Sequence, residues 1–98
     1  MPVRQVAPRR ADMKPPWTTQ LASDVVRDGL GLELLDTPYR VVAEVFRCDA
    51  DHTVTIRQFE DGIPADVLDD FVRDARERLG PFEDGSPLPV TFAVERAV

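Results

Sequence analysis

The stretch VVAEVFRCDADHTVTIRQF, residues 41–59, decides the fold because it reads as two strands joined by a tight turn. Apolar and polar side chains alternate on both sides of a group of turn-forming residues, and β-branched residues dominate the second half. A two-residue loop at Ala50 and Asp51 fixes the register of a hairpin built from residues 40–48 and 53–59. The cross-strand pairs that this register predicts are Val45 with Ile56, Glu44 with Arg57, Phe46 with Thr55 and Val42 with Phe59.

A further strand is predicted upstream, in the alternating sequence GLGLELL, residues 29–35. Gly29 and Gly31 would each cost a helix about 1 kcal/mol, and Pro38 has the fixed φ that suits a turn into the next strand. The predicted pairs are Leu34 with Ala43, Leu32 with Val45, and Gly31 with Phe46, whose ring can cover the bare glycine backbone. These three strands form an antiparallel meander.

An amphipathic helix is predicted over residues 64–79, where Pro64 suits the first turn and Gly80 and Pro81 end the helix. The apolar stripe that should face the sheet is Val67, Leu68, Phe71, Val72, Ala75 and Leu79. The residues expected to face outward are Asp66, Asp69, Asp70, Arg73, Asp74, Arg76, Glu77 and Arg78.

A fourth strand is predicted at about residues 89–96, because apolar and polar side chains alternate there. After a helical crossover it should run parallel to the third strand, and a right-handed crossover can seat it beside the first strand. The fold class is therefore α+β, with the order β-β-β-α-β.

The amino-terminal part divides at Trp17. Residues 1–16 form a proline-rich arm with four basic side chains against one acidic, which we expect to be disordered, and residues 17–98 form a single α+β domain. Residues 18–28 predict a short helix with Leu21, Val25 and Val26 on one side.

Composition excludes several classes of protein. No apolar run is long enough for a membrane span or a secretory signal, so we expect a cytoplasmic location. A single cysteine excludes an internal disulfide, and the net charge of −6 disfavours nucleic acid and anionic membranes as partners. Arginine predominates over lysine and asparagine is absent, which indicates a GC-rich bacterial genome.

No catalytic, cofactor-binding or metal-binding residue is predicted. Cys48 and His52 could suggest a nucleophile and its base, but the turn between them separates the two side chains. Residues 49–60 fit part of a calcium loop, yet Val54 stands where that loop needs glycine. A metal site of His52 with nearby aspartates lacks a second imidazole. No cofactor is expected, and the sequence leaves any small-molecule ligand undefined.

The sheet face away from the helix is half apolar and should need a cover. The predicted interaction surface consists of Trp17, Leu35, Val42, Glu44, Phe46, Arg57 and Phe59. We therefore expect a non-enzymatic protein-interaction or regulatory module that forms a homodimer, and expect Phe46 to matter for association. One alternative is a small enzyme or ligand-binding domain with a pocket at the helix–sheet or dimer seam. Another is an acidic inhibitor that mimics nucleic acid.

The segments GLGLEL, VVAEVFRCD, TVTI and IPADVLDDFVRDARERLG together resemble a group of small bacterial proteins of unknown function. The resemblance covers roughly residues 28–80 and implies a β-meander with one helix. It transfers no site residue.

Overall fold

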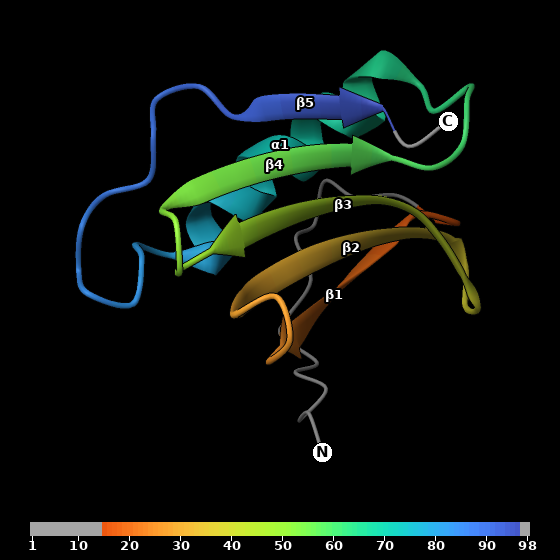
Figure 1. Ribbon diagram of the computed structural model, residues 1–98. Helices are drawn as coiled ribbons and strands as arrows, with labels where there is room; N and C mark the ends of the chain where they lie inside the picture. The colour runs from red at the N-terminus through yellow and green to blue at the C-terminus, as the bar shows by residue number, and fades with distance from the viewer. Residues whose placement is uncertain (1–14, 97–98) are drawn as a thin grey trace.

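The computed structural model describes residues 15–96 and contains one helix and a five-stranded sheet, an α+β arrangement (Figure 1). The elements are β1 (Thr18–Asp24), β2 (Gly29–Thr37), β3 (Arg40–Cys48), β4 (Thr53–Gln58), α1 (Ala65–Leu79) and β5 (Ala93–Arg96). The strands lie in chain order, with β1 and β5 at the two edges. We call the face against α1 the helix side and the opposite face the outer face. Residues 1–14 of the basic arm, which was predicted to be disordered over residues 1–16, lie outside the described part.

The chain forms a strand, β1, where the sequence pattern predicted a short helix, so four strands rather than three precede α1. Leu21 points to the helix side opposite Leu32 of β2, as alternation in a strand requires. Val25 and Val26, which the helical interpretation placed beside Leu21, lie in the β1–β2 turn and are 92 and 91% exposed. The helix prediction is therefore wrong.

The predicted register of the meander is confirmed along most of its length. The observed pairs include Leu32 with Val45, Leu34 with Ala43, Gly31 with Phe46, Val45 with Ile56, Glu44 with Arg57 and Phe46 with Thr55. The pairing becomes irregular after Leu34, so that Leu35 lies opposite Val41 instead of Val42. Val42, predicted to be on the outer face, belongs to the buried helix-side cluster with Leu34.

The helix α1 agrees with its predicted range, because Pro64 precedes it and Gly80 ends it at a φ of 66°, a conformation that favours glycine. Two outward assignments are wrong, those of Asp74 and of Arg78, whose side chain is only 13% exposed. Asp74 is only 3% exposed, and its carboxylate lies 3.5 Å from the guanidinium of Arg78, which also donates to the Thr19 hydroxyl at 2.9 Å. Asp74 therefore flanks the apolar stripe and does not face solvent. In residues 15–96 no helix is long and apolar enough to cross a membrane.

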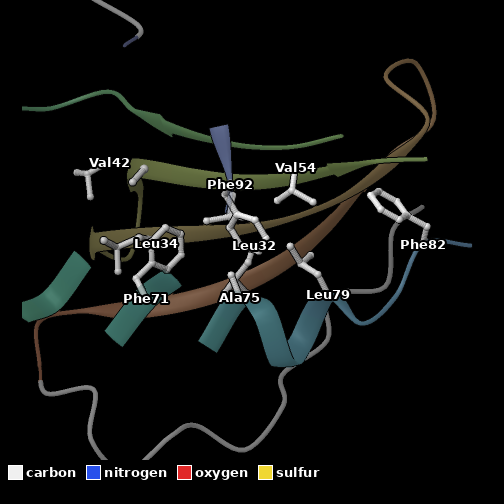
Figure 2. Close-up of a cluster of buried hydrophobic side chains, with 11 residues drawn as sticks. Leu32, Leu34, Val42, Val54, Phe71, Ala75, Leu79, Phe82 and Phe92 are labelled. Carbon is white, nitrogen blue, oxygen red and sulfur yellow. The ribbon is translucent and has the colours of Figure 1, made fainter. Parts of the chain in front are cut away.

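The core lies between α1 and the middle of the sheet, since α1 packs mainly on β2 and β3. Figure 2 shows the side chain of Phe71 extending from α1 toward Leu34 of β2. The buried cluster comprises Leu32, Leu34, Val42, Ala43, Val45, Val54, Phe71, Ala75, Leu79, Phe82 and Phe92. Phe82 and Phe92 belong to the α1–β5 connection, so this loop is part of the core.

The last strand is shorter than predicted and lies elsewhere in the sheet. β5 runs parallel to β4, as predicted, but it pairs with β4 itself and does not lie beside β2. The predicted position is occupied by β1. Residues 89–92 are not part of the strand, and the Arg76 guanidinium donates to the carbonyl oxygens of Pro89 and Val90 at 2.9 and 2.8 Å.

Candidate functional site

The predicted interaction surface is largely covered within the chain. Of its seven residues, Leu35, Val42, Glu44 and Phe46 are buried at 5, 1, 5 and 6% exposure, while Trp17, Arg57 and Phe59 are partly buried. Trp17 packs against the helix-side core. The apolar side chains that suggested a second chain on the outer face are thus already out of water.

Phe46 owes its burial to its own chain. The ring lies beside Gly31, as predicted, and the Arg27 guanidinium carbon stands 3.9 Å from the ring centroid. A cation over an aromatic face is attracted by the ring quadrupole. No sequence pattern indicates this contact, because Arg27 lies in the β1–β2 turn, where the pattern predicts a helix.

The charges of the outer face are paired differently from the sequence-based expectation. Arg57 lies opposite Glu44 in the register, but its Nε donates to Glu95 of β5 at 2.8 Å. Glu44 instead accepts two hydrogen bonds from Arg27, at 3.0 and 2.8 Å, which raise the pKa of Arg27 above its usual value. Two parallel hydrogen bonds between a guanidinium and a carboxylate are charge-assisted and fix the geometry of the pair. Arg27 therefore covers Phe46 and neutralises Glu44 at once.

These residues surround a shallow depression of about 270 Å³, here called the outer-face hollow, which is lined by Arg27, Phe46, Cys48, Thr55, Arg57 and Glu95. Three of the lining residues were singled out from the sequence, namely Phe46 and Arg57 as surface and Cys48 as a thiol. The Cys48 thiol donates to the backbone oxygen of Arg27 at 3.4 Å. His52 forms its hydrogen bond with Asp84. Cys48 and His52 are therefore not paired as nucleophile and base.

A second depression, of about 250 Å³, lies where the β3–β4 turn meets the α1–β5 loop. Its lining, here called the acidic cleft, is Asp28, Asp49, His52, Glu83 and Asp84. His52 Nε2 lies 2.8 Å from Asp84 Oδ2, and the Ser86 hydroxyl donates to Asp84 Oδ1 at 2.6 Å. The serine thus bonds to the carboxylate and not to the imidazole, which is not the order that a histidine base and serine nucleophile require.

The α1–β5 loop is held against the β3–β4 hairpin by two further side chains. The Arg47 Nη1 group donates to the backbone oxygens of Leu79 and Pro81, and Asp49 Oδ1 accepts from the Glu83 backbone nitrogen at 2.8 Å. With the His52–Asp84 contact, these bonds form what we call the loop clamp. The partners are more than 30 residues apart, beyond the reach of periodicity or turn patterns.

The Asp84 carboxylate makes one part of this clamp dependent on pH. Hydrogen bonds from Ser86, and then from His52, hold its pKa well below the usual range. A carboxyl with a lower pKa in the folded state adds stability above its unfolded pKa of about 4, and this is lost as the pH falls toward the folded value. The unfolding free energy of wild type should exceed that of Asp84→Asn near neutral pH. In urea unfolding the two should converge in acid; a difference constant with pH would contradict the coupling.

Metal ligands do not converge in the described part of the chain: within residues 15–96 no three His, Cys, Asp or Glu side chains are placed to hold an ion. Two members of the partial calcium pattern bond to each other, because the Thr53 hydroxyl donates to Asp51 at 2.6 Å.

Comparison of the chain with family models, curated proteins and solved structures finds no match.

The most exposed large apolar side chains lie in two turns and at the β5 edge. The large ones in the described residues that are most exposed are Val25, Val26, Tyr39, Val90 and Val94. The first three occupy the β1–β2 and β2–β3 turns, whereas Val94 lies in β5 and Val90 just before it. The β5 edge therefore combines apolar surface with strand backbone.

Proposed function

We propose that this protein is a non-enzymatic protein-interaction module that self-associates through the β5 edge of its sheet. The observation that carries the proposal is Val94, which lies in the middle of an edge strand and is 72% exposed. Val90, three residues before β5 begins at Ala93, is 92% exposed. Apolar side chains along an open strand favour pairing with a strand of another chain.

The backbone of β5 supports the same proposal. Among residues 15–96, no strand pairs with β5 on the side away from β4, as the top of Figure 1 shows. An edge strand presents unpaired N–H and C=O groups, which proteins commonly protect with charged side chains, lysine above all, with proline, with a bulge or by keeping the strand very short. The four-residue segment Ala93–Arg96 holds neither lysine nor proline, and its Glu95 carboxylate is bound to Arg57 of the neighbouring strand at 2.8 Å.

The outer face and the acidic cleft give less support to an enzymatic function, because their polar side chains are held by structural partners. Arg27 is bound to Glu44, Arg57 to Glu95, and His52 to Asp84. These pairs connect a turn to β3, β4 to β5, and the β3–β4 turn to the α1–β5 loop. They suit a rigid scaffold that presents an edge.

Self-association should depend on Val94. In sedimentation velocity, the wild-type chain is expected to shift with concentration from 11.0 kDa toward a species of twice that mass. Val94→Lys should weaken the association at least tenfold, because it places a charged side chain in the apolar contact, and tenfold corresponds to about 1.4 kcal/mol. The exposure of Val94 means that the variant should keep the wild-type thermal midpoint.

The matched control is Val26→Lys, which introduces the same charge at a site that is 91% exposed, in the turn at the other edge of the sheet. It should leave the association constant unchanged. A wild-type chain that stays monomeric up to millimolar concentration would overturn the proposed function, and equal weakening by both lysines would show that net charge is responsible.

A further inference from the structure

A single row of apolar side chains crosses all five strands on the helix side of the sheet. The register places Leu21 beside Leu32, Leu32 beside Val45, Val45 beside Ile56, and Ile56 beside Val94. Leu32 and Val45 are fully buried under α1, whereas Val94 at the end of the row is 72% exposed. The row thus reaches the β5 edge without a polar residue to end it.

We infer that a second copy of this chain continues the row, with the two β5 strands paired antiparallel and Val94 opposite Val94. The inference rests on the proposed self-association and specifies its geometry. A two-fold axis perpendicular to the sheet keeps the helix side of one copy next to the helix side of the other. In an antiparallel pair, residues directly opposite each other point to the same face of the sheet. The two-fold axis relates each residue to the same residue of the other copy, so the residue nearest the axis must lie opposite itself.

With this symmetry, two registers pair three residues of each β5 segment with the other copy. They differ in whether charged side chains lie directly opposite each other. Centring on Val94 joins the exposed ends of the two apolar rows and sets Ala93 opposite Glu95. Centring on Glu95 places two carboxylates directly opposite each other, which is destabilising. The Val94 register is therefore the one that the side chains of β5 favour.

This pairing would change the outer-face hollow as well. Phe46, Thr55 and Ala93 form one cross-strand row on the outer face, and the first two line the hollow. In the Val94 register the partner's Glu95 follows Ala93 in that row. The second copy thus contributes a carboxylate to the rim of the hollow, and the dimer joins two outer faces into one surface.

The register can be tested by disulfide cross-linking in a Cys48→Ser background, which removes the single native cysteine. Opposed residues in an antiparallel pair have Cα atoms about 4.5–5.5 Å apart, inside the range of about 4.4–6.8 Å that a disulfide needs. Val94→Cys should therefore oxidise to a covalent dimer in high yield. Glu95→Cys should stay at the collisional baseline, because its two copies would lie beyond disulfide reach.

Val26→Cys, which is more exposed than position 94 and lies in the turn at the other edge of the sheet, sets the collisional baseline. Cross-linking of Glu95→Cys above that baseline and above Val94→Cys would overturn the register but leave self-association intact. Baseline cross-linking of both β5 variants, in a chain that still sediments as a dimer, would overturn edge pairing itself. A wild-type chain that sediments only as a monomer would overturn the proposed function and this inference together.

Discussion

Replacing Phe71 with alanine is expected to lower the free energy of unfolding by about 3–5 kcal/mol. The ring is fully buried where α1 packs on β2 and β3, so the substitution removes apolar contact and leaves a cavity. Small domains have only about 5–15 kcal/mol of stability in total, and the variant should be marginally folded. Urea unfolding followed by circular dichroism measures the change.

Two comparisons keep this prediction specific. Tyr39 is 96% exposed, so Tyr39→Ala should change stability by no more than about 0.5 kcal/mol. Phe46→Ala should fall between the two, because that ring packs on Arg27 and the Gly31 backbone and less on apolar side chains, and the cost should not vary with protein concentration. A Phe71→Ala loss below about 1 kcal/mol would contradict the observed packing of α1.

Adding one methyl group at Gly29 is expected to destabilise the protein by about 2–3 kcal/mol. A Cβ atom there would overlap the backbone oxygen of Arg47 on the neighbouring strand and lie 2.7 Å from Cζ of Phe46. Backbone cannot move aside without separating β2 from β3, so the cost falls on strand pairing and on the packing of Phe46. Thermal or urea unfolding of Gly29→Ala measures the loss.

Gly31→Ala is the matched control, two residues along the same strand and on the same face. Its Cβ would lie 3.0 Å from the Glu44 carboxylate and 3.3 Å from the Phe46 ring, both of which are side-chain atoms that can shift. We expect a smaller loss than at Gly29. Equal losses at the two positions would mean that crowding against the Phe46 ring, which both positions share, and not the contact with Arg47, sets the effect.

The meander and the helix could be predicted because their signals are local. Alternation together with a turn of defined length fixes which residues are opposed, and the pairing of Val45 with Ile56 follows from the turn alone. The segment that forms β1 was wrongly predicted to be helical, because Val25 and Val26 continue an apparent helical stripe that begins at Leu21. What ends the strand is Asp24, whose carboxylate accepts hydrogen bonds from the backbone nitrogens of Val26 and Arg27.

The candidate surfaces were less predictable, because they depend on which distant residues meet. Phe46 was assigned correctly to the outer face, but its burial depends on Arg27 reaching across from a turn, which composition does not reveal. The apolar surface at the β5 edge, which contains Val94, was not predicted from the sequence either. Placing the last strand beside β2 would have covered a different edge, and the exposure of Val94 follows only from the observed pairing of β5 with β4.

The loop clamp has a consequence for cooperativity. The last carbonyls of a helix usually find partners in the residues that follow it, but here the Leu79 oxygen accepts from Arg47 of β3. The carboxyl end of α1 is thus completed by the sheet. Melting the hairpin would leave the Leu79 and Pro81 carbonyls without their donor, and melting the helix would leave the Arg47 guanidinium without these acceptors, so α1 and the β3–β4 hairpin should unfold together. We expect the helix and the hairpin to lose amide protection in a single transition.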